Sequence, residues 1–524
     1  MSKRAVRFLN TTGPCNLDDH YMRPPEERLF GAQLHRYIED KLYWTLHAPR
    51  QTGKTTFLQN WMREINAAAR ACACYVSVER CQGISDVKRA IPNICAAIQA
   101  FAGDVAGVPV PECAKTLPDS MLNATLRNWA EQAAPKPLIV LFDEVDVLEG
   151  KALISFLRQL RDGFASRGVG IFPTSIALVG MRDLKDYITA SKEGIAPNPG
   201  LPFNVKADSA VIGNFVCGDV ARLFAQRTAE TGQQITTEAL GYVWEQSRGQ
   251  PWIVNNLFMR ATMRVLDVSS TEMVNIEHVR AARQQMIEAR ETHLDALGKR
   301  LEDPRVKKII QAVITGENNP LGREDSEMEY TMDLGLIRWD KTKGFKISNP
   351  VYEEILTRIL NSKYHDSVPP LLTFRWQKSD GSLDMDALLK EFQKFWRRHS
   401  EVWEQTSNYT EAFPHLLLMG FLQRITNGDG RIEREYAAGR GRLDLLVEYA
   451  AQKFIIEIKL VHDYDTLAIV REEGLEQVVS YRDKITGSPP SYLIVFDRRA
   501  AGKKLPWGER IIWETVNGVT VIGC

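Results

Sequence analysis

The stretch Y-W-T-L-H-A-P-R-Q-T-G-K-T-T at residues 43–56 decides the fold of the first part of this chain. Its first five residues read as a short buried strand, and the amphipathic run F-L-Q-N-W-M-R-E-I follows as a helix. A phosphate group needs backbone N–H donors at a helix N-terminus, a lysine, and a hydroxyl that holds magnesium; Gly53, Lys54 and Thr55 supply them. Ala48 stands where such a loop usually carries its first glycine. The predicted contacts to ATP and Mg²⁺ are Ala48, Pro49, Arg50, Gln51, Thr52, Gly53, Lys54, Thr55 and Thr56.

A second apolar strand, P-L-I-V-L-F-D-E-V-D at 137–146, ends in acids. Asp143 is the predicted partner of magnesium, and Glu144 stands where a general base could polarise the attacking water. The alternative is a strand that simply ends in exposed acids. The later pattern S-I-A-L-V-G-M-R-D-L brings Arg182 to the same edge of a parallel sheet as a charge sensor, unless it pairs with Asp183 instead. The order of these elements predicts an α/β nucleotide domain.

A second candidate site lies in residues 434–459, which read R-E-Y-A-A-G-R-G-R-L-D-L-L-V-E-Y-A-A-Q-K-F-I-I-E-I-K. In a hairpin, Asp444 and Glu457 can converge, and Glu457 and Lys459 lie two residues apart on one face of a strand. Two carboxylates can hold magnesium for phosphodiester hydrolysis, and a lysine can orient the water. A solvated edge strand is the alternative. We favour catalysis because the strand is otherwise apolar, and burying these charges without a function would be costly.

Composition excludes several classes of protein. The 524 residues are 44% hydrophobic and 25% charged, which predicts a globular chain of three or four units rather than a disordered scaffold. The 66 basic and 66 acidic side chains cancel, so contact with nucleic acid must come from local patches. The eight cysteines contain no C-x-x-C pair and are predicted to be buried, reduced thiols. No run of about 18 apolar residues occurs, so we expect a cytoplasmic protein with no membrane contact.

The loop at 48–56, the D-E-V-D strand end and the turn Gly249-Gln250-Pro251 resemble the AAA-related ATPases of the archaeal-ATPase and STAND type, over roughly residues 25–365. The resemblance implies a P-loop ATPase core at 1–190 with a parallel sheet, followed by a helical lid at 191–297. It also implies that Pro251 lies near the nucleotide base. Proteins of this type are often switches or slow ATPases.

Residues 298–365 carry helix patterns followed by two strands joined by K-T-K-G, an order that predicts a winged-helix-like module. The region that would read DNA is acidic, which favours a structural or protein-contact role. Its acids are Glu324, Asp325, Glu327, Glu329 and Asp333, whereas Lys341, Lys343 and Lys346 favour nucleic acid. A linker and a helix whose aromatic residues are predicted core follow at 366–402.

The last part, 403–524, is similar to the PD-(D/E)XK nuclease superfamily, an α/β restriction-endonuclease-like fold. Its Q-V-V-S-Y segment matches the Q-x-x-x-Y element of the RecB-like members. The resemblance implies that Asp444 and Glu457 are metal ligands and that Lys459 is the catalytic lysine. Gln477 and Tyr481, four residues apart on one helical face, would position the DNA. The resemblance also implies an acid on the first helix as a further metal ligand, and Glu411 is the candidate. Arg440 and Arg442 either contact the phosphate backbone of the substrate or pair with Glu433 and Glu435.

Together these features predict an ATP-binding and ATP-hydrolysing protein with a Mg²⁺-dependent or Mn²⁺-dependent nuclease that cuts nucleic acid, DNA rather than RNA, under nucleotide control. One alternative is a signalling ATPase whose nuclease-like domain only binds nucleic acid or a protein. Another is a DNA-translocating motor. The resemblance also allows a homo-oligomer, and it implies a prokaryotic role in defence against mobile elements.

Overall fold

The structure is a computed structural model in which the chain divides into two compact units, each described here by itself. One unit comprises residues 1–286, 323–338 and 348–350, and the other comprises 287–322, 339–347 and 351–524. The described residues are 6–30, 33–168, 170–181, 206–267, 271–289, 292–315, 326–341, 344–365, 376, 378, 380–404, 413–426, 430–438, 441–462, 464–497, 499 and 512–524.

The first unit is built on a six-stranded sheet in the order β1-β6-β2-β5-β4-β3. Neighbouring strands run parallel, except that β1 is antiparallel to β6. The predicted α/β fold with a parallel sheet is therefore confirmed. The strands are β1 (Leu29–Phe30), β2 (Tyr43–His47), β3 (Cys72–Ser77), β4 (Leu138–Asp143), β5 (Ser175–Gly180) and β6 (Lys206–Ile212).

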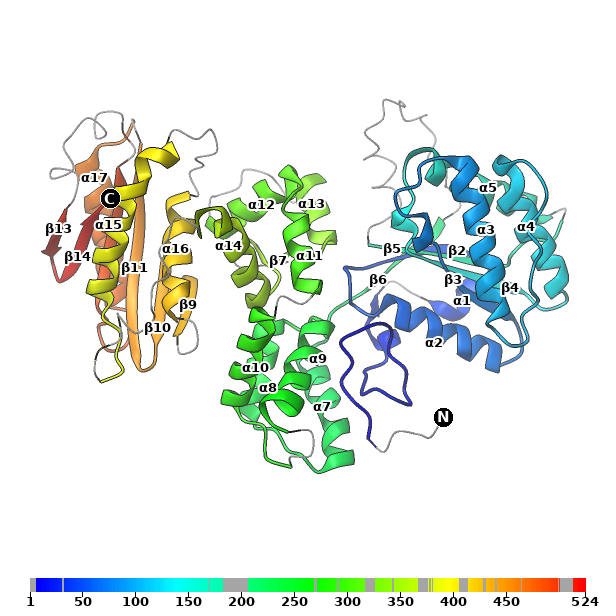
Figure 1. The fold of residues 1–524 in the computed structure, drawn as a ribbon, viewed down its shortest axis with the longest axis horizontal. Coiled ribbons are helices and arrows are strands. Elements are labelled where there is room, and N and C mark those ends of the chain that lie inside the picture. Colours follow the sequence, from blue (N-terminus) through cyan, green and yellow to red (C-terminus); the bar gives the residue numbers. More distant parts are fainter. Residues whose placement is uncertain are drawn as a thin grey trace. The chain divides into compact units, whose positions relative to one another are not determined.

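Helices cover both faces of this sheet, as Figure 1 shows. On one face, α3 (Val87–Gly103), α4 (Pro118–Ala133) and α5 (Gly150–Ala165) enclose a core that includes Trp129 and Phe156. On the other face, α1 (Leu34–Glu39) and α2 (Lys54–Ala67) pack Phe57 and Trp61 against the sheet. Because both faces are covered, the inner strands are apolar along their whole length rather than alternating with polar residues. Short helical turns are η1 (Pro25–Arg28), η2 (Glu79–Cys81), η3 (Val145–Val147) and η4 (Ser166–Gly168).

A helical segment follows the sheet in the same unit. It contains α7 (Cys217–Thr231), α8 (Thr237–Ser247), α9 (Pro251–Arg260), the π-helical turn η5 (Ala261–Val265) and α10 (Ile276–Glu288). Gly249, between α8 and α9, has φ +78°. A Cβ atom there would lie 2.1 Å from the carbonyl oxygen of Phe215, so only glycine allows this approach. The tight turn therefore holds the start of α9 against the segment that leaves β6.

The region predicted as a winged-helix-like module contains α11 (Thr292–Arg300), α12 (Pro304–Thr315), α13 (Ser326–Asp333), β7 (Ile337–Asp340), β8 (Gly344–Ile347) and α14 (Pro350–His365). The strands β7 and β8 form a two-stranded sheet. Their order after the helices agrees with the predicted elements, while Glu324, Asp325 and Lys343 lie outside the described residues. The winged-helix assignment stays a prediction.

The second unit contains another six-stranded sheet, in the order β13-β14-β12-β11-β10-β9. Its centre, β11-β12-β14, is parallel, and both edges are antiparallel. The elements are α15 (Met385–Glu404), α16 (Phe413–Thr426), β9 (Gly430–Ala438), β10 (Gly441–Tyr449), β11 (Gln452–Val461), α17 (Leu467–Arg482), β12 (Ser491–Asp497), β13 (Trp513–Val516) and β14 (Val519–Gly523).

The two faces of β11 and β12 pack against different helices. On one face, Val478 and Tyr481 of α17 pack with Ile455 and Leu493 of the strands. On the other face, the ring of Phe496 lies 4.6 Å from that of Trp396 on α15, measured between centroids. Phe392, Phe395 and Trp396 are buried, so the prediction that these aromatic residues are core is confirmed.

All eight cysteines are free, and five of them, Cys72, Cys74, Cys81, Cys95 and Cys524, are buried. Cys217 is exposed, and Cys15 and Cys113 are partly buried, so burial was predicted correctly for most of the thiols but not for all. In the part of the chain that the structure describes, no helix combines the length and apolarity that crossing a membrane requires.

Candidate nucleotide and metal sites

The loop between β2 and α2 folds around the side chain of Lys54. Gly53 caps α2 with φ 102°, a left-handed conformation that favours glycine. The Thr52 hydroxyl donates to the Pro49 carbonyl (2.9 Å), which tightens the turn. The Lys54 ammonium donates to the carbonyls of Ala48 (2.7 Å) and Pro49 (3.0 Å). Burial lowers the pKa of Lys54, because desolvation disfavours the charged ammonium.

The carboxylate of Asp143, at the end of β4, lies beside this loop. It is fully buried and accepts hydrogen bonds from the Thr55 hydroxyl (2.7 Å) and the Tyr75 hydroxyl (3.2 Å). The backbone N–H of Glu144 donates to its other oxygen (2.9 Å). The predicted pair Thr55 and Asp143 is thus brought into direct contact. Tyr75, on the neighbouring strand β3, was missed by sequence reasoning because it reads only as one more apolar residue of a buried strand.

Glu144 occupies a strained position next to the same loop. Its backbone is left-handed, with φ 59°. Burial, followed by the nearby carboxylates of Asp146 and Asp143, raises the pKa of Glu144 to about 7. A carboxyl group that titrates near neutrality can take up a proton from water, as a general base must. The role of Glu144 as a general base stays a prediction.

Arg28, at the end of η1, contacts the loop between β2 and α2. Its guanidinium donates to the carbonyls of Thr52 (3.0 Å) and Gly213 (2.5 Å) and lies 4.8 Å from the centroid of the Phe215 ring. Burial lowers the pKa of Arg28 to about 10. The N–H of Phe215 donates to the Gly249 carbonyl (2.8 Å). These contacts connect the loop to the turn before α9, and no sequence signal had singled Arg28 out.

The N-terminal segment spans α2 and α9. The Cys15 N–H donates to the Thr56 hydroxyl (3.0 Å), while the Trp252 indole donates to the Thr11 carbonyl (2.9 Å). The Asn255 amide donates to the Asn10 carbonyl (2.9 Å). The segment therefore links α2 to α9.

Four other predicted nucleotide contacts are less informative. Pro251 is buried at the first position of α9, behind Gln250, which caps that helix. Arg50 and Gln51 are exposed on the loop. Arg182 lies outside the described residues, as do Asp183, Glu411 and Arg440, and only the backbone of Arg442 is described.

The second candidate site is a fork where β10 and β11 separate. Their pairing ends at Leu445 and Ile456. Beyond that point, the Ile458 N–H donates to the Asp444 carboxylate (2.8 Å) and the Asp444 N–H donates to the Glu457 carboxylate (3.4 Å). Side chains thus replace the backbone ladder, and the two predicted acids converge as expected.

Lys459 lies on the same face as Glu457, as the strand alternation predicted. Its ammonium is 3.2 Å from the Glu457 carboxylate. Glu457 is only 3% exposed, and burial, followed by repulsion from Asp444, raises its pKa to about 7 although Lys459 opposes the shift. Ile456 and Ile458 are buried on the opposite face, which confirms the predicted alternation.

The donor chemistry of the fork fits a divalent cation, since two carboxylates meet there and carboxylate oxygens are ligands that Mg²⁺ prefers. Oxygen ligands from Asp444 and Glu457 would hold it, and a bound Mg²⁺ would supply Lewis acidity at the phosphate. Among the described residues, no three His, Cys, Asp or Glu side chains cluster in a way that could hold a metal. The two acids alone are therefore an incomplete ligand set within the described part of the chain.

The helix α17 lies close to Lys459, but its two predicted residues differ. A Cβ on Gly474 would lie 3.2 Å from Cγ of Lys459 and 2.8 Å from Cδ1 of Leu493, so these side chains would have to shift to accept a larger residue. Tyr481 is buried in the core beneath the helix, whereas Gln477 is exposed. Their role in positioning DNA stays a prediction.

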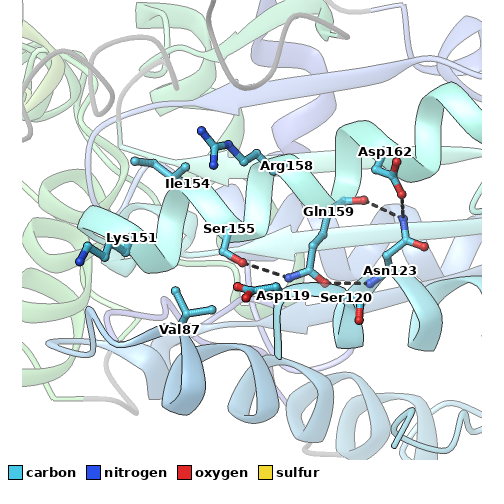
Figure 2. Close-up of a pocket in the computed structure, with 10 residues that line it drawn as sticks. All are labelled: Val87, Asp119, Ser120, Asn123, Lys151, Ile154, Ser155, Arg158, Gln159 and Asp162. Atoms are coloured by element: carbon cyan, nitrogen blue, oxygen red, sulfur yellow. Dashed lines mark hydrogen bonds between the residues drawn. The ribbon is translucent and has the colours of Figure 1, made fainter. Parts of the chain in front are cut away.

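A polar groove with a volume of about 590 Å³ lies over α4 and α5, as Figure 2 shows. The Gln159 amide nitrogen on its floor donates to the Pro118 carbonyl (3.0 Å) and to the Ser155 hydroxyl (3.1 Å). The Asn123 amide donates to Asp162 (3.1 Å). The groove contains none of the predicted site residues, and its polar floor groups are paired with one another.

No family model matches the sequence, and no curated protein matches it. Among solved structures, the chain is similar to a Walker-type ATPase of Pyrococcus abyssi, with 14% identity, 66% of this chain and 99% of that chain covered, and a TM-score of 0.48. It is similar to Cdc6p from Pyrobaculum aerophilum, with 13% identity, 61% of this chain and 88% of that chain covered, and a TM-score of 0.34. It is also similar to the Thermotoga maritima RuvB Holliday junction branch migration motor, with 13% identity, 61% of this chain and 90% of that chain covered, and a TM-score of 0.33. Because these TM-scores lie below 0.5, the likenesses add nothing to what the residues themselves show.

Proposed function

We propose that this protein is an ATP-binding and ATP-hydrolysing protein that controls a magnesium-dependent nuclease acting on DNA. The observation that carries the proposal is the fork between β10 and β11, where Asp444, Glu457 and Lys459 converge within one chain that also holds a phosphate-binding loop. Burying the charges of Glu457 and Lys459 is costly, which supports a functional role for the pair that they form.

The contacts of Lys54 and Thr55 in the loop between β2 and α2 support the nucleotide-binding part of the proposal. Lys54 can exchange its two carbonyl acceptors for phosphate oxygens, and the Thr55 hydroxyl already contacts the carboxylate of Asp143. Glu144 lies next to them with a pKa of about 7 and would accept the proton of the attacking water. Mg²⁺, when bound with ATP, neutralises charge on the phosphates.

The nuclease half is supported by the charges at the fork. Asp444 and Glu457 would bind and orient the cation, and Lys459 would stabilise the charge that develops at the phosphate or orient the water. Glu457 must lose its proton to serve as a ligand, since metal ligands bind in the deprotonated form.

Two other functions would use the same residues. A signalling ATPase would bind nucleic acid or a protein at the second unit without cutting, and a DNA-translocating motor would hydrolyse ATP faster when DNA is present. A homo-oligomer and a role in defence against mobile elements belong to the proposal through the family resemblance alone.

The test is cleavage of supercoiled plasmid and of single-stranded DNA by the full chain with Mg²⁺, in the presence of no nucleotide, ATP, or a non-hydrolysable analogue. Lys459→Ala should abolish cleavage. Lys453→Ala, on the same strand and paired with Glu448, is the matched control and should cut normally. If neither DNA is cut under any nucleotide condition, the nuclease proposal is wrong and the signalling function takes its place.

ATP turnover with and without DNA, measured on the same preparations, separates a switch from a motor. A slow rate that DNA leaves unchanged agrees with the switch. A severalfold stimulation by DNA that Lys54→Ala removes would replace it with the motor.

A further inference from the structure

The turn that follows β11 presents an aromatic ring to solvent a few residues after the candidate nuclease site in the chain. The His462 N–H donates to the Asp465 carboxylate (2.9 Å), and the Asp465 N–H donates to the His462 carbonyl (2.9 Å). Two hydrogen bonds between the same two residues close the turn. These two bonds hold His462 and Asp465 together, one on each side of Tyr464 in the chain.

Tyr464 is 82% exposed, more than any other large apolar side chain of the described residues. Its ring stacks on the imidazole of His462, with centroids 5.2 Å apart and planes inclined by 12°. Exposed apolar side chains are common singly, so exposure alone would mean little. Here one face of the ring is supported by a second ring, while the side chain as a whole stays open to solvent.

The position of this turn relates it to the fork. Lys459 and Glu457 lie near the carboxyl end of β11, and the turn follows that strand directly. Five residues separate Lys459 from Tyr464, which limits their Cα distance to at most roughly 17 Å. A strand of nucleic acid whose phosphate lies at the fork could therefore reach the ring within a few nucleotides.

The chemistry of the ring selects one kind of ligand. A nucleobase has a flat face that stacks on aromatic side chains, and this interaction tolerates any sequence. In a duplex these faces are covered by neighbouring base pairs, whereas an unpaired base offers its face freely. The ring carries no charge, so it would not by itself attract the phosphate backbone.

We propose that Tyr464, supported by His462, is a stacking platform for an unpaired base of single-stranded nucleic acid next to the cleavage site. This inference rests on the proposed nuclease function and deepens it, because it names single-stranded substrate, or duplex with an unpaired end, as the preferred class. The contact is a positioning one, and Tyr464 takes no part in the chemistry.

The test is binding of fluorescent 20-nucleotide single-stranded and duplex DNA to the full chain in EDTA, so that no cleavage occurs. Tyr464→Ala should weaken single-strand binding by about 5- to 150-fold, the range for removing one stacked base, and should leave duplex binding unchanged. Tyr464→Phe keeps the ring and should bind like the wild type. Ile469→Ala removes an exposed aliphatic side chain from the first turn of α17 and should also bind like the wild type.

A spectroscopic readout separates stacking from a merely structural role. The emission of 2-aminopurine placed in the single strand should be quenched by the wild type and by Tyr464→Phe, but not by Tyr464→Ala. Equal single-strand affinity of Tyr464→Ala and the wild type would overturn the proposal, as would equal losses for duplex and single strand. Either result would assign the exposed ring to another role, such as contact with a protein.

Failure of this inference can be told apart from failure of the nuclease proposal. Cleavage that Lys459→Ala abolishes and Tyr464→Ala leaves unchanged on single strands keeps the nuclease and removes the platform. Tyr464-dependent binding of single strands without any cleavage keeps the platform and removes the nuclease.

Discussion

The loop between β2 and α2 and the β10–β11 fork both bring a lysine close to buried acids, but the lysine has different partners in the two sites. In each, burial and a neighbouring carboxylate raise the pKa of a glutamate to about 7, Glu144 in one and Glu457 in the other. At the loop, Lys54 is held by backbone carbonyls. At the fork, Lys459 is paired directly with Glu457.

The different partners of the two lysines predict which contacts a ligand would have to replace at each site. At the loop, the lysine and the acids have separate partners, so a phosphate can replace the carbonyls without disturbing Asp143. At the fork, the lysine partly neutralises the acid that a cation would need. A cation there must compete with Lys459 and with a proton on Glu457, and its binding is expected to depend strongly on pH.

The strongest test of the loop is Lys54→Ala. Because the ammonium is the buried cation that would meet the phosphates, its loss should reduce ATP turnover by about a hundredfold or more, as removal of a preorganised electrostatic group does. Lys151→Ala, an exposed lysine on α5, is the control and should change turnover little. Steady-state ATPase measurements check this, and an active Lys54→Ala protein would contradict the proposed site.

The matching test of the fork is Asp444→Asn. The amide keeps the size of the side chain but removes one of the two charges that would hold the cation, so cleavage should fall by roughly a hundredfold or more. Glu448→Gln, on the same strand, should cut like the wild type. Gel-based cleavage rates provide the measurement, and normal cutting by Asp444→Asn would show that the fork is not the metal site.

The connection between the loop and α9 is tested by Gly249→Ala. The added methyl would collide with the Phe215 carbonyl at positive φ, so the folded state should lose about 2–4 kcal/mol. Gly241→Ala is the matched control, since that glycine is exposed in α8 with no atom within 4 Å of an added Cβ. It should gain about 0.5–1 kcal/mol from higher helix propensity. Denaturant titration measures both, and equal stability of the two variants would remove the packing argument.

The smallest effect concerns pH at the fork. Because the folded-state pKa of Glu457 is raised from 4.5 to about 7, its contribution to stability is present below pH 4.5 and is lost as the pH rises through about 7. Over the same window, the proton competes with Mg²⁺, so cation affinity should rise by up to about tenfold per pH unit until Glu457 is ionised. Calorimetric Mg²⁺ titration at pH 6 and pH 8 tests this. Glu457→Gln should remove the pH dependence, and a pH-independent affinity in the wild type would contradict the prediction.

Sequence reasoning located the elements that depend on local pattern. The strand, loop and helix at 43–65 and the strand that ends in Asp143 are specified by apolar runs and a short motif, so they could be found without coordinates. The same holds for the alternation that turns Glu457 and Lys459 to one face and Ile458 to the other.

Contacts between distant segments could not be found in this way. Arg28 supports the loop from 24 residues before Thr52, and Tyr75 reaches Asp143 from the neighbouring strand. Neither residue belongs to a motif, because each acts through a position in space rather than a spacing in the chain.

The sequence by itself predicted two phosphate-directed sites and the lysines and acids that they would contain, since side-chain periodicity and loop chemistry act over a few residues. The tertiary structure alone decided which charges meet and how deeply they are buried. It placed Thr55 on Asp143 and Glu457 beside Asp444, and the pKa of each glutamate follows from that burial, because desolvation depends on everything that surrounds a group in space.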